Sequence, residues 1–270
     1  MTADESQHTR LTSSVAVAAS KVPEVTVAFW ITKALTTGMG ESSSDYLVHT
    51  LPPAVAVVLG FIALLGALAI QFRARRYVPW IYWLAVAMVG VFGTMAADVL
   101  HVGLHVPYKV STVFFAVTLA AVFTVWFLTE RTLSIHSIYT PRREFFYWAA
   151  VVTTFALGTA AGDLSAVTLR RGYFSSGVMF AIVILVPAVA HWRFGMNPIL
   201  AFWFAYIVTR PLGASFADWL GVSHRRGGLA LGPGPVSLSL AALIVTFVAY
   251  LTVIDSRARD STAKSAEHVA

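Results

Sequence analysis

The sequence predicts an all-α integral membrane protein with eight transmembrane helices, and three observations support this fold class. Of the 270 residues, 57% are hydrophobic and 12% are charged, whereas soluble domains carry about a quarter charged residues. Eight apolar runs have the roughly 20-residue length that a helix needs to cross a bilayer. A motif of tryptophan, glycine and aspartate recurs in every second run. Such a chain has too little polar surface for a soluble globule.

The eight spans are justified in chain order by their length and by the positions of charged residues. The second, fourth, sixth and eighth have no Asp, Glu, Lys or Arg in their interiors, as expected for helices in lipid. The first, third, fifth and seventh each carry an aspartate close to their ends. The predicted spans are 25–48, 51–72, 78–100, 110–128, 145–167, 174–192, 198–220 and 236–253.

The spans leave no room for a separate soluble domain, because the longest connection is 129–144. We predict a single eight-span membrane domain over 23–254, with polar cytoplasmic tails at 1–22 and 255–270. The first tail lacks a basic segment followed directly by an apolar core, so it is not typical of a signal peptide. The repeats within the domain are predicted at about 23–73, 77–129, 142–193 and 197–254.

Basic residues predict that both tails are cytoplasmic, because cytoplasmic loops are enriched in Lys and Arg. Five basic residues fall in the loops assigned to the outside, namely Lys109, Arg170, Arg171, Arg225 and Arg226. Twelve fall on the side of the tails: Arg10, Lys21, Arg73, Arg75, Arg76, Arg131, Arg142, Arg143, Arg193, Arg257, Arg259 and Lys264. Arginine facing anionic lipid also accounts for the formal charge of +6 without nucleic acid as a partner.

The odd-numbered spans are copies of one motif. They read FWITKALTTGMGESSSDYL, YWLAVAMVGVFGTMAADVL, YWAAVVTTFALGTAAGDLS and FWFAYIVTRPLGASFADWL. An aromatic residue precedes each tryptophan, a glycine follows ten residues later and an aspartate five residues after that: Trp30, Gly40 and Asp45; Trp83, Gly93 and Asp98; Trp148, Gly158 and Asp163; Trp203, Gly213 and Asp218. Since each repeat holds two spans, we predict four parallel repeats that cross the membrane in the same direction.

The motif also predicts which helices lie inside the bundle. At about 100° per residue, the glycine, the aspartate and the in-span charges Lys33, Glu41 and Arg210 fall within an arc of about 140°. Ionisable groups in a span face the bundle interior, and glycine allows close packing. We therefore predict that the odd helices are inner and the even helices outer. The tryptophans are predicted to pack the repeats and anchor the cytoplasmic interface, roughly 22 Å from the aspartates.

The chain resembles a family of bacterial membrane proteins built from a fourfold repeat of unknown function. The segments KVPEVTVAFWITKALTTGMGESSSDYL, TERTLSIHSIYTPRREFFYW and FWFAYIVTRPLGASFADWL carry the resemblance, which covers about 21–254. The family is labelled as uncharacterised membrane-anchored protein, with two spans and a characteristic tryptophan per repeat. The resemblance implies an eight-span protein of the bacterial inner membrane. It singles out Lys21, Pro23, Glu24, Trp30, Lys33, Gly40, Glu41, Asp45, Arg210, Pro211, Gly213 and Asp218.

Four aspartates at one depth form the strongest polar signal. Converging carboxylates can bind a cation or relay protons, and their mutual repulsion calls for a cation, an arginine or protonation. The structural alternative is that each aspartate bonds a neighbouring helix and fixes how the repeats pack. We predict an ion path at Asp45, Asp98, Asp163, Asp218 and Glu41.

Three charged residues break the fourfold symmetry. Lys33 and Glu41 occur only in the first repeat, and Arg210 only in the last. If the repeats close into a ring, Glu41 and Arg210 differ in depth by roughly 6 Å, within reach of an ion pair. Two interpretations stay open: Lys33 and Arg210 gate the path or tune its charge, or the Arg210–Glu41 pair clamps the two ends of the bundle.

Histidines near two aspartates predict a second kind of site. Asp45 with His49, and Asp98 with His101, could bind a metal ion, with Mn²⁺ favoured by oxygen ligands; the alternative is histidines in interfacial loops. Cysteine is absent, which excludes thiolate sites and disulfides. The motifs of zinc proteases, serine hydrolases and phosphate-binding loops are missing as well, so we predict no enzyme and no cofactor other than a bound cation.

These observations predict a membrane transporter or channel for a small inorganic cation, including a divalent metal such as manganese. Its partners would be the lipid bilayer and a small cation or proton. The alternative is a scaffold or regulatory protein that does not transport and whose buried Asp, Arg and Glu are structural. An intramembrane enzyme is a minor alternative.

Overall fold

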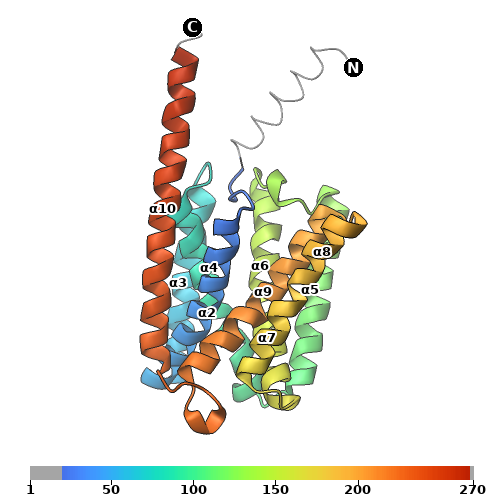
Figure 1. Cartoon of the computed structure of the whole chain (residues 1–270), viewed down its shortest axis with the longest axis vertical. Helices are drawn as coiled ribbons and strands as arrows, with labels where there is room; N and C mark the ends of the chain where they lie inside the picture. Colours follow the sequence, from blue (N-terminus) through green and yellow to red (C-terminus); the bar gives the residue numbers. More distant parts are fainter. Residues whose placement is uncertain (1–19, 268–270) are drawn as a thin grey trace.

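The computed structural model describes residues 20–267, and within that range the chain is helical and has no β-strand, which confirms the all-α prediction. Two consecutive helices, α7 and α8, are separated only by Ile184 and together form one rod. The helices are α2 Val27–Thr50, α3 Pro53–Arg73, α4 Pro79–Asp98, α5 Tyr108–Glu130, α6 Pro141–Asp163, α7 Tyr173–Val183, α8 Leu185–Phe194, α9 Pro198–Gly221 and α10 Pro233–Glu267 (Figure 1).

Local capping explains where the helices of the repeated motif begin. The Thr26 hydroxyl accepts a hydrogen bond from the backbone N–H of Phe29, and Thr140 does the same for Arg143. The Asn197 side chain caps α9 in the same way. Such caps satisfy backbone donors that have no partner in the first turn, and proline is favoured directly after them. The cap at Thr140 starts α6 at Pro141, four residues before the predicted span at 145.

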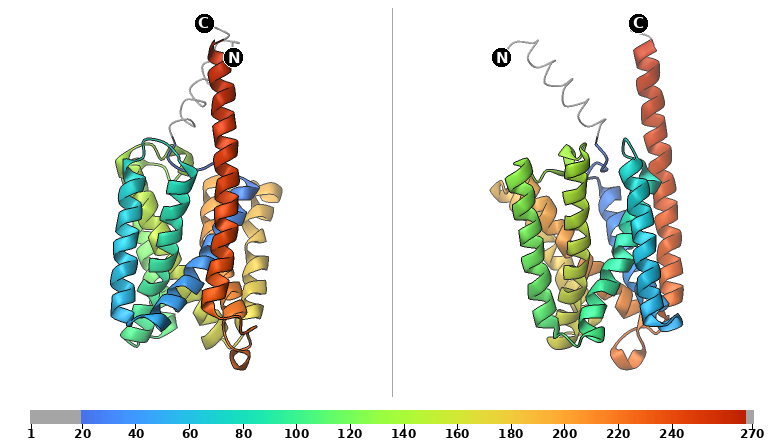
Figure 2. Two further views of the ribbon diagram at one scale, coloured as in Figure 1. Left: turned by 90° about the vertical axis from the view of Figure 1, so that its left-hand side faces the viewer. Right: turned by 180° about the vertical axis from the view of Figure 1, so that it is seen from behind.

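The two ends of the described chain add structure to the predicted tails. Helix α10 continues past the predicted span at 236–253 to Glu267, beyond the rest of the bundle (Figure 2). Of the predicted N-terminal tail, 1–19 lie outside the described residues. Residues 20–22 pack against the bundle, where the side chain of Lys21 is held in an ion pair with Glu144.

Seven of the helical rods are long and apolar enough to cross a membrane: Pro53–Arg73, Pro79–His101, Tyr108–Glu130, Pro141–Thr168, Tyr173–Phe194, Pro198–Gly221 and Pro233–Arg257. Helix α2 has the length but lacks the hydropathy, because its second half reads TTGMGESSSD. Other helices compensate by surrounding it, since α4, α9 and α10 all pack against α2. Its polar residues Thr36, Glu41 and Ser44 are therefore buried.

The four helices that carry the repeated motif form a closed ring. Each packs against two others in the order α2, α4, α6, α9 and back to α2. The intervening helices lie outside this ring, each mainly against the ring helix of the following repeat: α3 on α4, α5 on α6, α7 on α9, and α10 on α2. The ring helices run in one direction and the intervening ones in the other (Figure 1). The last repeat thus meets the first as any repeat meets the next.

Side-chain exposure follows the same division. In α4, α6 and α9, at least half of the most apolar stretch of the helix is buried inside the bundle. The buried share is only 22% in α3, in α5 and in the rod of α7 and α8, and it is 6% in α10. The intervening helices expose large apolar side chains, among them Val113, Phe114 and Val117 of α5. Apolar surface of this extent calls for a partner other than water.

Aromatic pairs link each repeat to the next at the end where the motif helices begin. The aromatic residue before each tryptophan packs against the tryptophan of the following repeat. The ring-centroid distances are 5.6 Å for Phe29–Trp83, 5.7 Å for Tyr82–Trp148, 6.1 Å for Tyr147–Trp203 and 5.7 Å for Phe202–Trp30. These separations are typical of favourable aromatic contacts. The paired aromatic residues of the motif therefore close the ring.

The tryptophans of the motif pack between the repeats, and their role as anchors of the membrane interface stays a prediction. Trp83, Trp148 and Trp203 are buried, and Trp30 is half-buried. The indoles that face outward are Trp80 at the start of α4 and Trp192 near the end of α8. The ring of helices therefore draws the repeated tryptophans inward.

Candidate functional site

The repeat glycines position the centre of the ring. A Cβ added to any of them would collide with the residue that lies seven positions after the tryptophan in the next repeat. Gly40 meets Gly90 in this way, Gly93 meets Phe155, Gly158 meets Arg210, and Gly213 meets Thr37. Glycine is required here because the neighbouring residue occupies the space of a side chain. At Gly158 that space holds the stem of the Arg210 side chain.

Arg210 is held by equivalent positions of the other three repeats. Eleven residues after the tryptophan stand Glu41, Thr94 and Thr159, and in the fourth repeat Ala214. The Arg210 Nη2 group lies 2.7 Å from Glu41 Oε2, donates to Thr159 Oγ1 at 2.8 Å, and contacts Thr94 Oγ1. One guanidinium from the fourth repeat thus binds one side chain from each of the others.

The burial of this ion pair makes its partners obligatory. The side chain of Arg210 is 0% exposed and that of Glu41 is 6% exposed. Arg210 Nη1 also donates to the backbone carbonyl of Thr37 at 3.0 Å. A buried charge costs several kcal/mol unless it is paired and hydrogen-bonded. The pair that the sequence places between the first and last repeats is therefore present and closes the ring electrostatically.

Lys33, the second cation inside the ring, lies between two aromatic rings. Its side-chain nitrogen is 4.1 Å from the ring centroid of Phe155 and 4.1 Å from that of Tyr206. The residue is 1% exposed, and this nitrogen has no hydrogen-bond partner among the described residues. The Arg210 guanidinium carbon lies 5.2 Å from the same Phe155 ring. Phe155 therefore contacts both cations through its π face, an attraction that strengthens when water is excluded.

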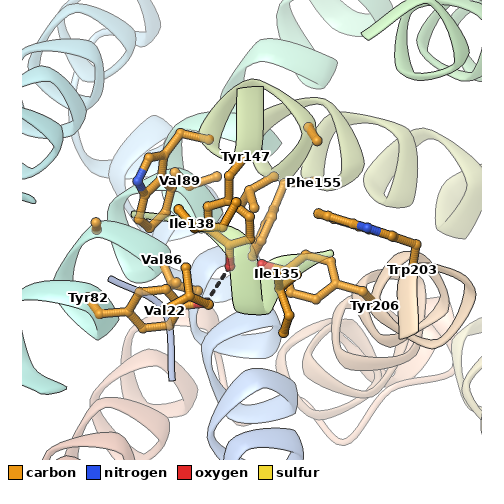
Figure 3. Packing of buried hydrophobic residues seen from close by; sticks show 14 of the residues in the cluster. Val22, Tyr82, Val86, Val89, Ile135, Ile138, Tyr147, Phe155, Trp203 and Tyr206 are labelled. Carbon is orange, nitrogen blue, oxygen red and sulfur yellow. Dashed lines mark hydrogen bonds between the residues drawn. The ribbon is translucent and has the colours of Figure 1, made fainter. Parts of the chain in front are cut away.

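A layer of tyrosines lies next to Lys33 in the ring. Tyr82, Tyr147 and Tyr206 are each 0% exposed. The hydroxyl oxygens of Tyr82 and Tyr147 are 2.5 Å apart. Figure 3 shows the three rings pointing toward one another from α4, α6 and α9. Buried tyrosine hydroxyls need hydrogen-bond partners. Those of Tyr82 and Tyr147 bind each other across the ring, whereas the Tyr206 hydroxyl has no hydrogen-bond partner among the described residues.

The four repeated aspartates lie where the ring helices end. Asp98 and Asp163 are the last residues of α4 and α6, and a π-helical turn follows each of them, at Val99–Gly103 and Leu164–Thr168. Asp218 lies in the last turn of α9, and Asp45 lies five residues before the end of α2. Turns of π-helix are often associated with functional sites.

The four aspartates are alike in their exposure and in lacking partners among the described residues. All four residues are half-buried, and no hydrogen bond or ion pair within residues 20–267 engages their carboxylates. The structure thus places the four aspartates at the same end of the ring, and their carboxylate oxygens have no protein ligand among the described residues.

The histidines of the predicted metal site are bonded to backbone carbonyls. His49 Nδ1 lies 2.6 Å from the carbonyl oxygen of Asp45, and His101 Nδ1 lies 2.7 Å from that of Val106. The His101 ring also stacks on Tyr108. Among the described residues, no group of three or more His, Asp or Glu side chains could hold a metal ion. The metal site at Asp45, His49, Asp98 and His101 stays a prediction.

A second buried ion pair lies at the opposite end of the bundle from the aspartates. Lys21 Nζ lies 2.6 Å from Glu144 Oε2 and donates to the carbonyl of Phe72 at 3.2 Å. Gln71 donates to the other oxygen of Glu144 at 3.0 Å. Backbone hydrogen bonds from Lys21 to Ile138 and from Tyr77 to Ser20 fix this segment across the loops. Glu144 itself is 0% exposed.

The sequence prediction missed several of these residues. Thr94 and Thr159 are ordinary in a membrane helix, but their position in the repeat, equivalent to that of Glu41, was an available signal. The pair of Lys21 and Glu144 is separated by 123 residues, so no local pattern connects it. Tyr206 occupies the repeat position of Lys33, three residues after the tryptophan, which was a second available signal.

Comparison with known proteins gives a family but no precedent for the chemistry. A family model described as "Repeat of Unknown Function (DUF347)" matches four times, at 28–77, 81–132, 146–197 and 201–256. No curated protein and no solved structure matches the chain. The four matches coincide with the four copies of the motif and together cover most of the sequence. The chain therefore belongs to the family built from this fourfold repeat of unknown function.

Proposed function

We propose that this protein moves a small inorganic cation, or a proton, across the bacterial inner membrane, along the axis of the ring and without an enzymatic step. The observation that carries the proposal is the acidic level formed by Asp45, Asp98, Asp163 and Asp218. The four aspartates occupy equivalent positions at one end of the ring, and their carboxylates have no hydrogen-bond or ion-pair partner in the described part of the chain. Rings of carboxylates are a recurring device for selecting cations.

The membrane placement that we propose has eight spans, with α2, α4, α6 and α9 inside and the intervening helices facing lipid. Seven rods have the required length and hydropathy. The polar helix α2 fits because α4, α9 and α10 shield it, as ionisable groups in a bilayer require. The first described residues and the end of α10 lie at the same end of the bundle (Figure 1). The excess of Lys and Arg there favours the cytoplasmic side.

The polar groups along the ring axis suggest how an ion would be handled. A cation reaching the acidic level next meets Glu41, whose carboxylate already binds the Arg210 guanidinium. Arg210 acts in this proposal as a tethered competitor: an ion advances only when the guanidinium leaves Glu41. The proposed site for the transported ion is thus the aspartates together with Glu41, and it requires no other cofactor.

Two buried ion pairs lie toward the two ends of the bundle. Arg210–Glu41 lies toward the aspartates, and Lys21–Glu144 lies at the opposite end. Between them are Lys33 and the tyrosine layer, both shut off from solvent. In this proposal the Lys21–Glu144 pair also closes the pathway at its end, and a pathway closed on both sides fits a transporter that opens one side at a time better than it fits an open channel. We therefore favour a transporter, with Lys33 setting the charge of the middle section.

The test is ion flux into proteoliposomes that contain the purified chain. A panel of protons, Na⁺, K⁺ and Mn²⁺ would be read with ion-sensitive dyes inside the vesicles. We expect one ion to enter, and the fourfold variant Asp45→Asn, Asp98→Asn, Asp163→Asn and Asp218→Asn to abolish its entry. Glu24→Gln is the matched control, because Glu24 is exposed and outside the ring. Unchanged flux in the fourfold variant would refute the proposal.

A second candidate function is a scaffold or regulator that transports nothing. The observation that favours it is the clamp itself, since Arg210 joins all four repeats through Glu41, Thr94 and Thr159. In that case the intact protein gives no flux above that of empty vesicles for any ion. The Asp→Asn variants would then change only the stability of the bundle, measured by denaturant unfolding in detergent.

A further inference from the structure

A lateral cavity opens where the outer layer of the bundle is interrupted. It has a volume of about 890 Å³ and lies among α2, α8 and α9. Its walls include Trp30, Ala188, Ala205 and Leu212. The size falls within the range of small-molecule sites. The cavity lies outside the axis of the ring, and the proposed ion path does not use it.

The cavity coincides with a break in one outer helix. Proline lacks a backbone N–H, and its ring clashes with the carbonyl four residues earlier. Pro187 therefore cannot continue the helix from Val183, and Val183 is where α7 ends. The rod restarts as α8 at Leu185, and Pro187 lines the cavity. In the first and second repeats the corresponding helices α3 and α5 are uninterrupted.

The lining matches a hydrocarbon chain. It contains no Asp, Glu, Lys or Arg, and three of its few polar residues gather at one end: Ser134, His136 and His191. Along α9 the wall runs from Pro198 to Leu212, which is about 21 Å at 1.5 Å per residue. Half of a bilayer's hydrocarbon core is about 15 Å. The groove is therefore long enough for an acyl chain that crosses one leaflet.

The polar end of the cavity suits an anionic headgroup. Trp192 and Phe194, at the end of α8, are 85% and 81% exposed, and such aromatic residues mark the membrane interface. Exposed Arg193 follows His191 by two residues, and exposed Arg131 precedes Leu133 of the cavity wall by two. Basic pockets at the cytoplasmic face bind anionic lipid headgroups.

We propose that this cavity binds one acidic phospholipid, with an acyl chain against α8 and α9 and the headgroup beside His136, His191 and Arg193. The inference rests on the membrane placement proposed above and is independent of ion transport. The bound lipid would fill this cavity, which Ile184, Pro187 and Ala188 line on the side of the outer helix. It would thereby connect α8 to α2, the first helix of the ring.

The test uses the full chain purified in detergent, stripped of lipid and mixed with either phosphatidylglycerol or phosphatidylcholine. Native mass spectrometry would count the lipids that each chain retains. We expect one phosphatidylglycerol per chain and much weaker retention of phosphatidylcholine. Arg193→Gln should weaken retention of phosphatidylglycerol by about fivefold, the factor that corresponds to roughly 1 kcal/mol per basic residue. It should leave phosphatidylcholine unaffected.

A matched pair of variants separates the cavity from the rest of the lipid-facing surface. Ala188→Phe fills the cavity, whereas Ala63→Phe enlarges an equally exposed alanine of α3. Retention should be lost in the first variant and kept in the second. Equal retention in both, or equal retention of the two phospholipids, would overturn the proposal. Lipid counting needs no transported ion, so this proposal and the transport proposal fail independently.

Discussion

The two buried ion pairs of this molecule draw their partners from different sources. Arg210 and Glu41 both stand on ring helices, at repeat positions whose equivalents in the other copies also contact the guanidinium. Lys21 comes from the segment before α2, and Glu144 from the first turn of α6. The ion pair at the centre of the ring is therefore built from positions that belong to the repeat. The end of the bundle is closed by a segment outside the repeated motif.

Removing the central guanidinium should have the largest effect. Arg210→Met leaves the carboxylate of Glu41 buried without its charge partner, so the free energy of unfolding should fall by about 3–5 kcal/mol. Denaturant unfolding in detergent would measure the loss. Arg225→Met is the control, because Arg225 is exposed and its loss should cost almost nothing. The double variant Arg210→Met with Glu41→Met should recover most of the stability; no recovery would refute this account.

The pair at the other end should be less sensitive to the same change. Lys21→Met removes one partner of Glu144, but Gln71 still donates to that carboxylate. We expect a loss of about 1.5–3 kcal/mol, the range for a hydrogen bond to a charged group. Lys109→Met, at an exposed lysine, serves as the control in the same unfolding measurement. A loss as large as that of Arg210→Met would show that the two ends are equivalent after all.

Crowding the stem of Arg210 should disturb the central pair without removing a charge. A Cβ at Gly158 would collide with the Cβ and Cγ of Arg210, whereas one at Gly66 meets nothing within 4 Å. Gly158→Ala should therefore cost about 1–3 kcal/mol. Gly66→Ala should be neutral or stabilising by up to about 1 kcal/mol, because alanine favours the helix. Melting temperatures in detergent would compare the two variants. Equal melting temperatures would contradict the collision between a Cβ at position 158 and the Arg210 side chain.

The tyrosine layer between the two pairs should give the smallest effect. Tyr82→Phe removes the hydroxyl that lies 2.5 Å from that of Tyr147, at a cost of about 1 kcal/mol. Tyr250→Phe is the control, since Tyr250 is 58% exposed. If the thermal midpoints of the two variants coincide, the hydrogen bond across the ring contributes nothing to stability.

Much of this fold could be predicted from the sequence because the repeat is regular. Equal spacing in four copies indicated helices of one direction, and ring closure brought Glu41 within reach of Arg210. It could not show that Arg210 would reach the threonines of the second and third repeats, because that depends on the side-chain space left by Gly158. It also predicted that the tryptophans pack the repeats, but it could not show that each would meet the aromatic residue of the preceding repeat.

The ends of the chain were less predictable for a different reason. Lys21 and Glu144 come together only when the loops at one end of the bundle are stacked. The break in the outer helix at Ile184 depends on Pro187, which an apolar run conceals. In both cases the residues that decide the structure, Lys21 with Glu144 and Pro187, lie outside the repeated motif. Periodicity therefore describes the ring and says little about what is attached to it.

The links between successive repeats have a consequence for connectivity. Phe202 meets Trp30 as Phe29 meets Trp83, and Gly213 meets Thr37 as Gly40 meets Gly90. The ring consequently has no privileged starting point. A circularly permuted chain that opens between α5 and α6, with a linker joining α10 to the segment before α2, would bury the same surfaces. The order of the repeats along the gene could change while their order around the ring stays the same.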